Sequence, residues 1–198
     1  MISPTLVHIN DPRILPIDKK EVMRYLKMFS LDKEASSLID ESIESVYKFS
    51  NPRATYIRTD IKILDDIVDF GFDKVKSVKL AKNLCSCNEA YVVGATLGLD
   101  LERMLERLSK TDTARCVVCS AVGSALIESF CDYVNNLLAK ENNLCPRFSP
   151  GYGDFLIAHQ PRILEAIDAS KKIGVSLTDN FMMIPTKSVT AIIGIKEE

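Results

Sequence analysis

Helical periodicity is the most extended pattern in this sequence. Apolar side chains recur every three or four positions in several segments, which places them on one face of an amphipathic helix. This spacing predicts helices at residues 18–29, 32–49, 77–84, 100–109, 111–140 and 160–172. In the longest of these helices the expected core stripe is Val118, Val122, Leu126, Phe130, Tyr133 and Leu137.

Strand patterns lie between the helical segments. Residues 53–65 alternate β-branched and aromatic residues with polar ones, which is typical of a strand with two different faces. Residues 90–98 are almost continuously apolar, which favours a central strand covered on both sides. Further strands are expected at residues 67–72, 181–183 and 188–195, the last two as a pair joined through Pro185–Lys187.

Helices and strands are segregated along the chain more than they alternate. The predicted fold class is therefore α+β, with a twisted antiparallel β-sheet packed with helices. The first 16 residues contain Pro4, Pro12 and Pro16 and are expected to form an irregular arm. We expect residues 1–50 to be this arm and helices packed on the main domain, and residues 51–198 to be the main α+β domain.

The composition is that of an ordinary globular protein, with 46% hydrophobic residues, 26% charged residues and a net charge of −2. A nucleic-acid-binding protein normally has a basic patch and a high pI, so this class is disfavoured. No apolar run approaches the roughly 20 residues that span a bilayer. The segment Met1–Pro4 also lacks the basic start of a signal peptide. The expected location is the cytoplasm.

Six cysteines raise the question of a metal site. Cys116 and Cys119 have C-x-x-C spacing and Cys85 and Cys87 form a second pair, but zinc and iron–sulfur sites usually take such pairs from loops. Cys116 and Cys119 lie inside the predicted 111–140 helix, which favours buried free thiols that behave as small hydrophobic side chains. We therefore predict no metal site, and no disulfides in a reducing cytoplasm.

Common catalytic motifs are missing from the sequence. There is no P-loop, G-x-G-x-x-G, G-x-S-x-G or H-E-x-x-H. His8 and His159 are the two histidines, so histidine-based metal or triad chemistry has almost no material, and His159 is expected to be a surface or capping residue at a helix start. Cys145 would need a base partner to act as a nucleophile, and the sequence indicates none.

One segment has the composition of a loop that approaches a ligand. Pro150 stiffens its entry, and Gly151 and Gly153 flank Tyr152, so that backbone and one aromatic ring can come close to another molecule. Arg147, just upstream, can form a bidentate pair with a ligand carboxylate or phosphate. The alternative for Arg147 is a structural salt bridge that fixes the loop.

A second face of the predicted 111–140 helix carries small residues around one carboxylate. Small side chains leave room for a close neighbour or a ligand, and the carboxylate could pair with an amine or a sulfonium. The alternative is an ordinary solvated helix face. The residues on this face are Ala121, Ser124, Glu128 and Cys131.

With these residues the chain resembles the activation, or reactivation, domain of vitamin B12-dependent methionine synthase. The family's Arg-x-x-Pro-Gly-Tyr motif corresponds to Arg147–Tyr152, and its later Thr-acidic-polar-aromatic-x-Met-x-Pro motif corresponds to Leu177–Pro185. Lys187–Val189 matches the turn into the family's last strand, although alone it would be simply an exposed turn. Leu126–Phe130 resembles a family helix. The resemblance covers about residues 85–195 well and the first 80 residues loosely.

The resemblance implies a function in methionine biosynthesis. The family domain binds S-adenosylmethionine and remethylates cobalamin that has been oxidised to the inactive cob(II)alamin state. An electron from a flavodoxin-type or ferredoxin-type donor produces cob(I)alamin, which takes the methyl group. The implied cofactors are thus S-adenosylmethionine and cobalamin, the latter presented by a partner protein. Because cobalt supplies the nucleophile of this methyltransferase reaction, no catalytic histidine or serine is needed.

The resemblance also implies roles for individual residues. Arg147 would bind the carboxylate of the ligand's methionine part, and Glu128 would meet the ligand's positive end. Gly151 would bring its backbone to the ligand, and Tyr152, near the corrin face, is the expected catalytic residue. An accompanying aspartate of the family falls at Ser124 here, which puts the affinity for the ligand in question.

The family's cobalamin domain ligates cobalt through an Asp-x-His-x-x-Gly motif, and neither histidine here lies in that context. The 198 residues also leave no room for homocysteine, folate or cobalamin domains. We therefore expect a stand-alone module that acts on a separate methionine synthase or other corrinoid protein, without nucleic-acid or membrane partners. Two alternatives stay open: a non-catalytic interaction or ligand-sensing module of the same fold, and a redox or metal protein built on the cysteines.

Overall fold

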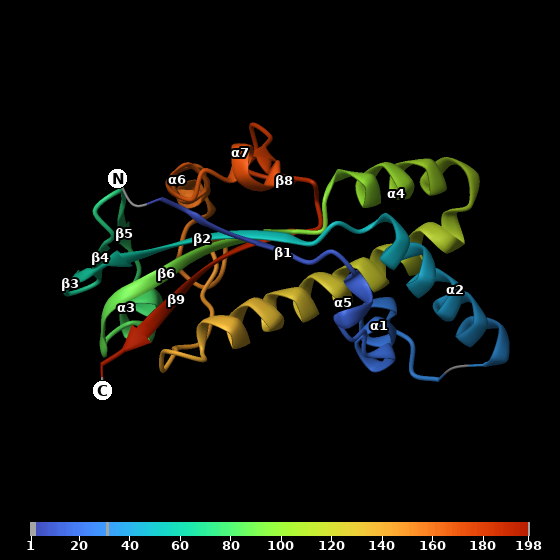
Figure 1. Ribbon diagram of the computed structural model, residues 1–198, viewed down its shortest axis with the longest axis horizontal. Helices are drawn as coiled ribbons and strands as arrows, with labels where there is room; N and C mark the ends of the chain where they lie inside the picture. The colour runs from blue at the N-terminus through green and yellow to red at the C-terminus, as the bar shows by residue number, and fades with distance from the viewer. Residues whose placement is uncertain (1–2, 31, 198) are drawn as a thin grey trace.

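Four antiparallel strands form the main sheet of the computed structural model, which describes residues 3–30 and 32–197 (Figure 1). Their spatial order is β1 (Thr5–His8), β2 (Arg53–Asp60), β6 (Cys87–Thr96) and β9 (Ser188–Lys196). The apolar strand β6 is central, as its sequence predicts, and β1 and β9 form the two edges. The predicted α+β class with an antiparallel sheet is confirmed.

Two smaller antiparallel sheets complete the strand inventory of the described residues. A three-stranded meander extends beyond the end of β2, and Gly71, which follows its middle strand, has a positive φ of 80° at the predicted bend. A two-stranded ribbon precedes β9 in the chain. The meander consists of β3 (Lys62–Leu64), β4 (Ile67–Asp69) and β5 (Lys74–Lys76), and the ribbon of β7 (Ser176–Leu177) and β8 (Met183–Ile184).

The helices begin where the sequence provides capping side chains. The carboxylates of Asp18, Asp32 and Asp112 and the hydroxyl of Ser77 each accept a hydrogen bond from a backbone N–H of the first turn. The helices are α1 (Lys19–Leu26), α2 (Lys33–Phe49), α3 (Val78–Asn83), α4 (Leu99–Thr111), α5 (Thr113–Leu138), α6 (Gln160–Ala166) and α7 (Ala169–Ile173), with short 3₁₀ turns at Pro12–Ile14 and Ile157–His159.

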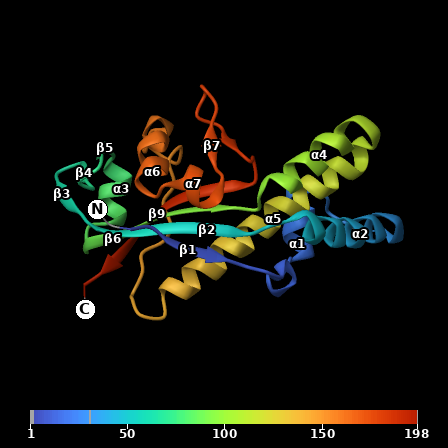
Figure 2. The ribbon, with the colours of Figure 1, turned by 45° about the horizontal axis from the view of Figure 1, so that its top comes forward.

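The main sheet has a hydrophobic core on each face. On one face α5 crosses the sheet, and α1, α2 and α4 pack against α5 (Figures 1 and 2). On the other face α3, α6, α7 and the meander cover residues such as Val92 and Ile192. The first core includes Ile9, Leu15, Val22 and Val46, so the N-terminal region contributes to the same interior as the central strands.

Helix α5 is long and apolar enough to cross a membrane by length and composition alone, whereas no apolar run of that length was expected from the sequence. Half of its most apolar window is buried within the protein. It packs on the sheet and on three other helices, as the core helix of a soluble domain does. Its core stripe also differs from the expected one, because the buried residues continue through Val134 and Leu138 while Tyr133 is exposed.

Strand pairing differs from the sequence prediction at both chain ends. The arm expected for residues 1–16 contains an edge strand, since residues 5–8 pair with residues 53–56. The pair predicted between residues 181–183 and 188–195 is wrong. Strand β9 pairs with β6, and β8 pairs with β7. A hydrogen bond of 3.0 Å from Leu97 N to Lys187 O and one of 2.8 Å from Ser188 Oγ to Thr96 Oγ1 fix the start of β9 against the end of β6.

The helix predicted at residues 160–172 is divided into α6 and α7. Asp168 has a left-handed conformation, with φ of 49°, which ends α6 and starts α7. The preceding Ile167 is fully buried, and its carbonyl accepts a hydrogen bond of 3.1 Å from Thr55 Oγ1 of β2. The interaction with the sheet therefore replaces the helical continuation that the local sequence favours.

Candidate functional site

The predicted ligand-approaching loop follows the segment that extends the edge of β9. Residues 143–148 run beside the second half of β9, with hydrogen bonds between Phe148 and Ile192 in both directions at 2.8–2.9 Å. Among the described residues, no strand pairs with the outer edge of the first half of β9, residues 188–191. The backbone on this side of β9 has no strand partner, although Ser188, Thr190 and Ala191 are buried as whole residues.

Two glycines shape the loop itself. Gly151 and Gly153 have positive φ values of 87° and 63°, which an L side chain adopts only with strain. Gly151 N donates to Phe155 O at 2.7 Å and closes the turn. Tyr152 is left 67% exposed, with its ring edge against Phe148 at a centroid distance of 5.5 Å. The loop thus presents an aromatic ring to solvent from a defined backbone.

Asp154 fastens the end of the loop to helix α3. Its carboxylate accepts hydrogen bonds from Ser77 Oγ at 2.5 Å and from Val78 N at 2.8 Å. The Ser77 hydroxyl, with the backbone N–H groups of Lys79 and Val78, holds the pKa of Asp154 below its usual value. The loop is therefore held by charge-assisted hydrogen bonds at the start of a helix.

Arg147 and Glu128, both predicted site residues, lie together. Arg147 Nη2 is 3.3 Å from Glu128 Oε2 and 3.0 Å from Asp132 Oδ1, so one arginine faces two carboxylates on successive turns of α5. The side chain of Arg147 is 27% exposed, and its buried Nη1 has no hydrogen-bond partner. The structural salt bridge considered for Arg147 is present, and one donor group remains unused.

Ser124 lies one turn before Glu128 on α5 and contacts a second cation. Lys187 Nζ donates to Ser124 Oγ at 2.8 Å and to Ser120 Oγ at 3.1 Å. Burial lowers the pKa of Lys187, although the nearby Glu102 acts in the opposite direction. No carboxylate of the described chain lies within 4.0 Å of this ammonium. The alternative that Lys187 lies in a simple exposed turn is wrong, because its side chain is half-buried.

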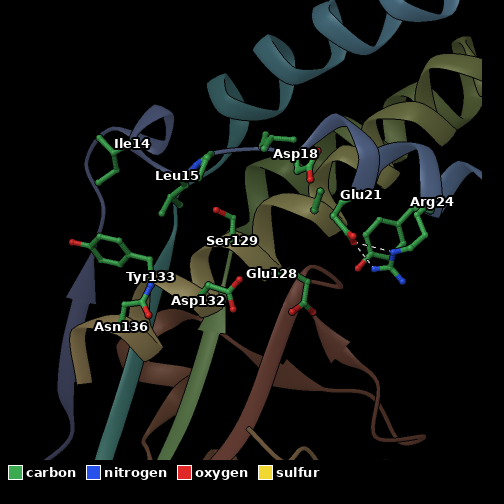
Figure 3. Close-up of a pocket in the computed structure, with 14 residues that line it drawn as sticks. Ile14, Leu15, Asp18, Glu21, Arg24, Glu128, Ser129, Asp132, Tyr133 and Asn136 are labelled. Atoms are coloured by element: carbon green, nitrogen blue, oxygen red, sulfur yellow. Dashed lines mark hydrogen bonds and ion pairs between the residues drawn. The ribbon is translucent and has the colours of Figure 1, made fainter. Parts of the chain in front are cut away.

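An open pocket of about 800 Å³ lies beside Glu128 and Asp132, between α5 and the segment leading into α1 (Figure 3). Glu128 and Asp132 line it from α5, and Glu21 lines it from α1. Arg24, on the same helix, is paired with Glu21 at 2.5 Å. Carboxylates therefore outnumber unpaired cations around the pocket, which favours positively charged ligand groups there.

The cysteines are distributed as single thiols and one close pair. Cys119 is buried, and Cys116 Sγ donates to Leu105 O at 3.4 Å. Cys87 Sγ and Cys145 Sγ lie 3.4 Å apart, and burial, followed by this contact, raises the pKa of Cys87 to about 11. Within residues 3–30 and 32–197, no group of three or more His, Cys, Asp or Glu side chains has the arrangement of a metal site.

The structure gathers some predicted site residues and leaves others apart. Glu128 and Arg147 pair directly, and Ser124 lies on the same helix face. Tyr152 and Gly151 lie on the adjoining loop and form no hydrogen bond to those three side chains in the described chain. His159 directly precedes α6 as expected, but its partly buried ring makes no capping hydrogen bond and lies with Nδ1 2.7 Å from Asp73 Oδ2.

Two contacts of the candidate site were not anticipated from the sequence, those of Asp132 with Arg147 and of Lys187 with α5. Asp132 follows Glu128 by four positions, so helical spacing alone could have placed it beside the same partner. The partners of Lys187 are more than 60 residues away in sequence, and no local signal indicates such a contact.

Comparisons with known proteins identify the fold. A scan against protein-family models gives no match for this sequence, and a sequence comparison with curated proteins gives none either. Among solved structures, the chain is similar to one described as "Crystal Structure of the MetH Reactivation Domain bound to AdoHcy". The TM-score is 0.73 at 16% sequence identity, over 98% of this chain and 78% of that chain. The resemblance seen in the sequence is therefore confirmed at the level of the fold, which is that of a methionine synthase reactivation domain.

Proposed function

We propose that this protein binds S-adenosylmethionine and its demethylated product, S-adenosylhomocysteine (AdoHcy). The observation that carries the proposal is the contact between Arg147, which precedes the Gly-Tyr-Gly loop, and Glu128 on α5, beside the unpaired half of β9. The similar solved domain is described as bound to AdoHcy, which supports this ligand class. The residues proposed for the site are Arg147, Glu128, Ser124, Gly151 and Tyr152.

The charges of the site complement those of the ligand. S-adenosylmethionine carries a carboxylate, an ammonium and a sulfonium, and the α5 face offers carboxylates at Glu128 and Asp132 with cations at Arg147 and Lys187. The exposed ring of Tyr152 and the glycine backbone beside it provide an apolar surface for the adenosyl group or for a larger planar cofactor.

We further propose that the bound methyl donor serves the reductive remethylation of cob(II)alamin on a separate corrinoid protein or methionine synthase. When bound, the reduced corrinoid supplies the nucleophile. The part of this chain is to position the methyl donor and to exclude water, which needs no catalytic base. Tyr152 is the proposed contact to the corrin face, because its ring is exposed. A flavodoxin-type or ferredoxin-type protein is the proposed electron donor, and the cytoplasm the proposed location.

A second candidate function is ligand sensing without methyl transfer. It is favoured by Ser124, which stands where the resemblance implies an aspartate and which contacts Lys187 rather than an open surface. A protein of this kind would bind the adenosyl ligand and change its association with a corrinoid methyltransferase. It would not restore methylated cobalamin.

Titration of the purified protein with AdoHcy by calorimetry tests the proposal. We expect saturable binding of one ligand per chain, and competition by S-adenosylmethionine at the same site. Metal analysis of the same sample addresses the alternative of a metal protein. Absence of binding by both ligands to the folded protein would contradict the proposed function.

A further inference from the structure

The row of polar side chains along α5 separates into a cationic and an anionic half. Ser120, Ser124, Glu128 and Asp132 follow one another at intervals of four residues and form a line on one helix face. Lys187 lies against the first two, and Arg147 lies against the last two. The ammonium of Lys187, beside Ser124, and the carboxylate of Glu128 therefore lie on adjacent turns of α5.

The two cations of the row differ in how far neighbouring carboxylates already neutralise their charge. Arg147 is already opposed by two carboxylates at 3.3 and 3.0 Å, so its local charge is more than balanced. Lys187 is opposed by two neutral hydroxyls, and no carboxylate of the described residues lies within ion-pair distance. A partly buried ammonium with no carboxylate in direct contact gains from a ligand anion, because burial weakens competition from water. Glu102, which accepts a hydrogen bond from Thr186 N, is the nearest carboxylate that acts on Lys187, and it lies beyond ion-pair distance.

We propose that Lys187, with the hydroxyls of Ser120 and Ser124, binds the carboxylate of the ligand's amino-acid part, while Glu128 binds its ammonium. The inference rests on the proposed function and changes one role that the resemblance implies, namely the carboxylate partner. An α-amino acid carries both charged groups on one carbon atom, and Ser124 and Glu128 are neighbours about 5–6 Å apart between their Cβ atoms on a helix. Arg147 then acts as a positioning residue that orients Glu128 and fixes the loop to α5.

One feature of the sequence fits this subsite. The residue at 124 is a serine where the resemblance implies an aspartate. An aspartate at this position would neutralise Lys187, whereas a serine leaves its charge for a ligand.

The test compares AdoHcy with 5′-methylthioadenosine, which has the same adenosyl thioether without the amino acid. Lys187→Met keeps the aliphatic side chain and removes the charge. We expect it to weaken AdoHcy binding by about 10- to 100-fold, the usual effect of losing a charged hydrogen-bonding group. Binding of 5′-methylthioadenosine should stay within about twofold of the parent. Lys171→Met is the matched control, because its side chain is 85% exposed on another part of the surface, and it should change neither affinity.

Glu128→Gln provides a second measurement. With an ammonium at Glu128, this variant should weaken AdoHcy and S-adenosylmethionine by the same factor, since both carry the amino group. A selective loss of S-adenosylmethionine would place the sulfonium at Glu128 and overturn the proposed arrangement.

The outcomes separate the subsite from the proposed function. If the parent binds neither adenosyl ligand, the function is wrong and the subsite falls with it. If the parent binds AdoHcy and folded Lys187→Met binds it equally, only the subsite is wrong. Equal loss of AdoHcy and 5′-methylthioadenosine in that variant would show a structural role instead. If Lys187→Met fails to fold, Ser124→Ala must give the same selective loss, at smaller size, for the proposal to stand.

Discussion

At the scale of single residues, what each charged side chain can bind depends on the opposite charges that already contact it. Arg147 could have been free to bind a ligand or engaged in a salt bridge, and the structure pairs it with Glu128 and Asp132. Cys131 beside it is a buried thiol whose pKa burial raises to about 12, so it stays protonated near neutral pH. The thiol therefore adds no charge to the ion pairs of Arg147 with Glu128 and Asp132.

Arg147→Ala tests whether this arginine positions the site or binds the carboxylate itself. We expect AdoHcy and 5′-methylthioadenosine to lose affinity together, by about tenfold or more, because the loop and Glu128 lose their common anchor. Arg162→Ala is the matched control, since Arg162 is exposed and pairs only with Glu165 in the described chain. Calorimetric titration of both variants with both ligands measures the effect. If only AdoHcy loses affinity, Arg147 and not Lys187 binds the carboxylate of the ligand's amino-acid part.

Gly194 is a residue whose small size the core requires. A Cβ at this position would lie 2.6 Å from Leu84 Cδ2 and 2.7 Å from Cys87 Sγ, both in a buried cluster. Gly194→Ala should therefore lower the free energy of unfolding by about 1–3 kcal/mol through overpacking. Urea unfolding measures this change, and Cys87→Ala in the same chain should restore part of the loss. A variant as stable as the parent would contradict the crowding that the structure shows.

The sequence indicated Arg147 and Glu128 because each belongs to a motif with recognisable spacing. It named Lys187 only as part of a turn, because the contacts of Lys187 with Ser120 and Ser124 join residues more than 60 positions apart. Contacts of this kind arise from the meeting of β9 with α5, and local propensity carries no information about them. Sequence reasoning named Arg147 and Glu128 as candidates, and the fold was needed to show which charged groups lie beside them.

At the scale of elements, the helices with strong periodicity and clear caps were predicted correctly. Helix α2 begins after Asp32 and ends at Phe49 as expected, and α5 covers nearly the whole predicted span. Prediction was wrong where tertiary contacts override local preference, as at Ile167, whose carbonyl bonds to β2 and ends α6. Edge strand β1 was missed because prolines flank it, and prolines are compatible with a sheet edge.

Asp154 connects two elements, the candidate loop and helix α3. Asp154→Asn should destabilise the protein at neutral pH, because an amide has no charge and one acceptor oxygen in place of two. The folded pKa of Asp154 is lowered, so its contribution is present above the unfolded pKa of about 3.9 and is lost as pH falls through the folded value. The free energies of unfolding of the parent and of Asp154→Asn should thus become equal at acidic pH.

The measurement for Asp154 is the urea midpoint of unfolding at neutral and at acidic pH. Asp179→Asn is the control, because Asp179 is exposed and accepts no hydrogen bond in the structure described. An unchanged midpoint for Asp154→Asn at neutral pH would show that the carboxylate does not stabilise the connection.

At the scale of the whole molecule, the sheet separates two cores with different relations to the site. The α5 face carries the charged row and the pocket, and the opposite face carries α3, to which the loop is fastened. The candidate site thus lies where the loop passes the free half of the β9 edge, with both cores supporting it. A sheet packed on both faces is suited to positioning a ligand for a second protein.

The last prediction concerns that second protein. Tyr152 is 67% exposed on a loop fixed at Asp154, and under the proposed function a partner would bring a large planar cofactor to this ring. Remethylation should therefore require four components together: this chain, a corrinoid protein, a low-potential electron donor and S-adenosylmethionine. The decay of cob(II)alamin absorbance follows the reaction. Tyr152→Ala should slow it while leaving the urea midpoint near that of the parent, since an exposed ring contributes little to stability. Remethylation at an equal rate without this chain, or a corrinoid that copurifies tightly with it alone, would show that it does not act on a partner's cofactor.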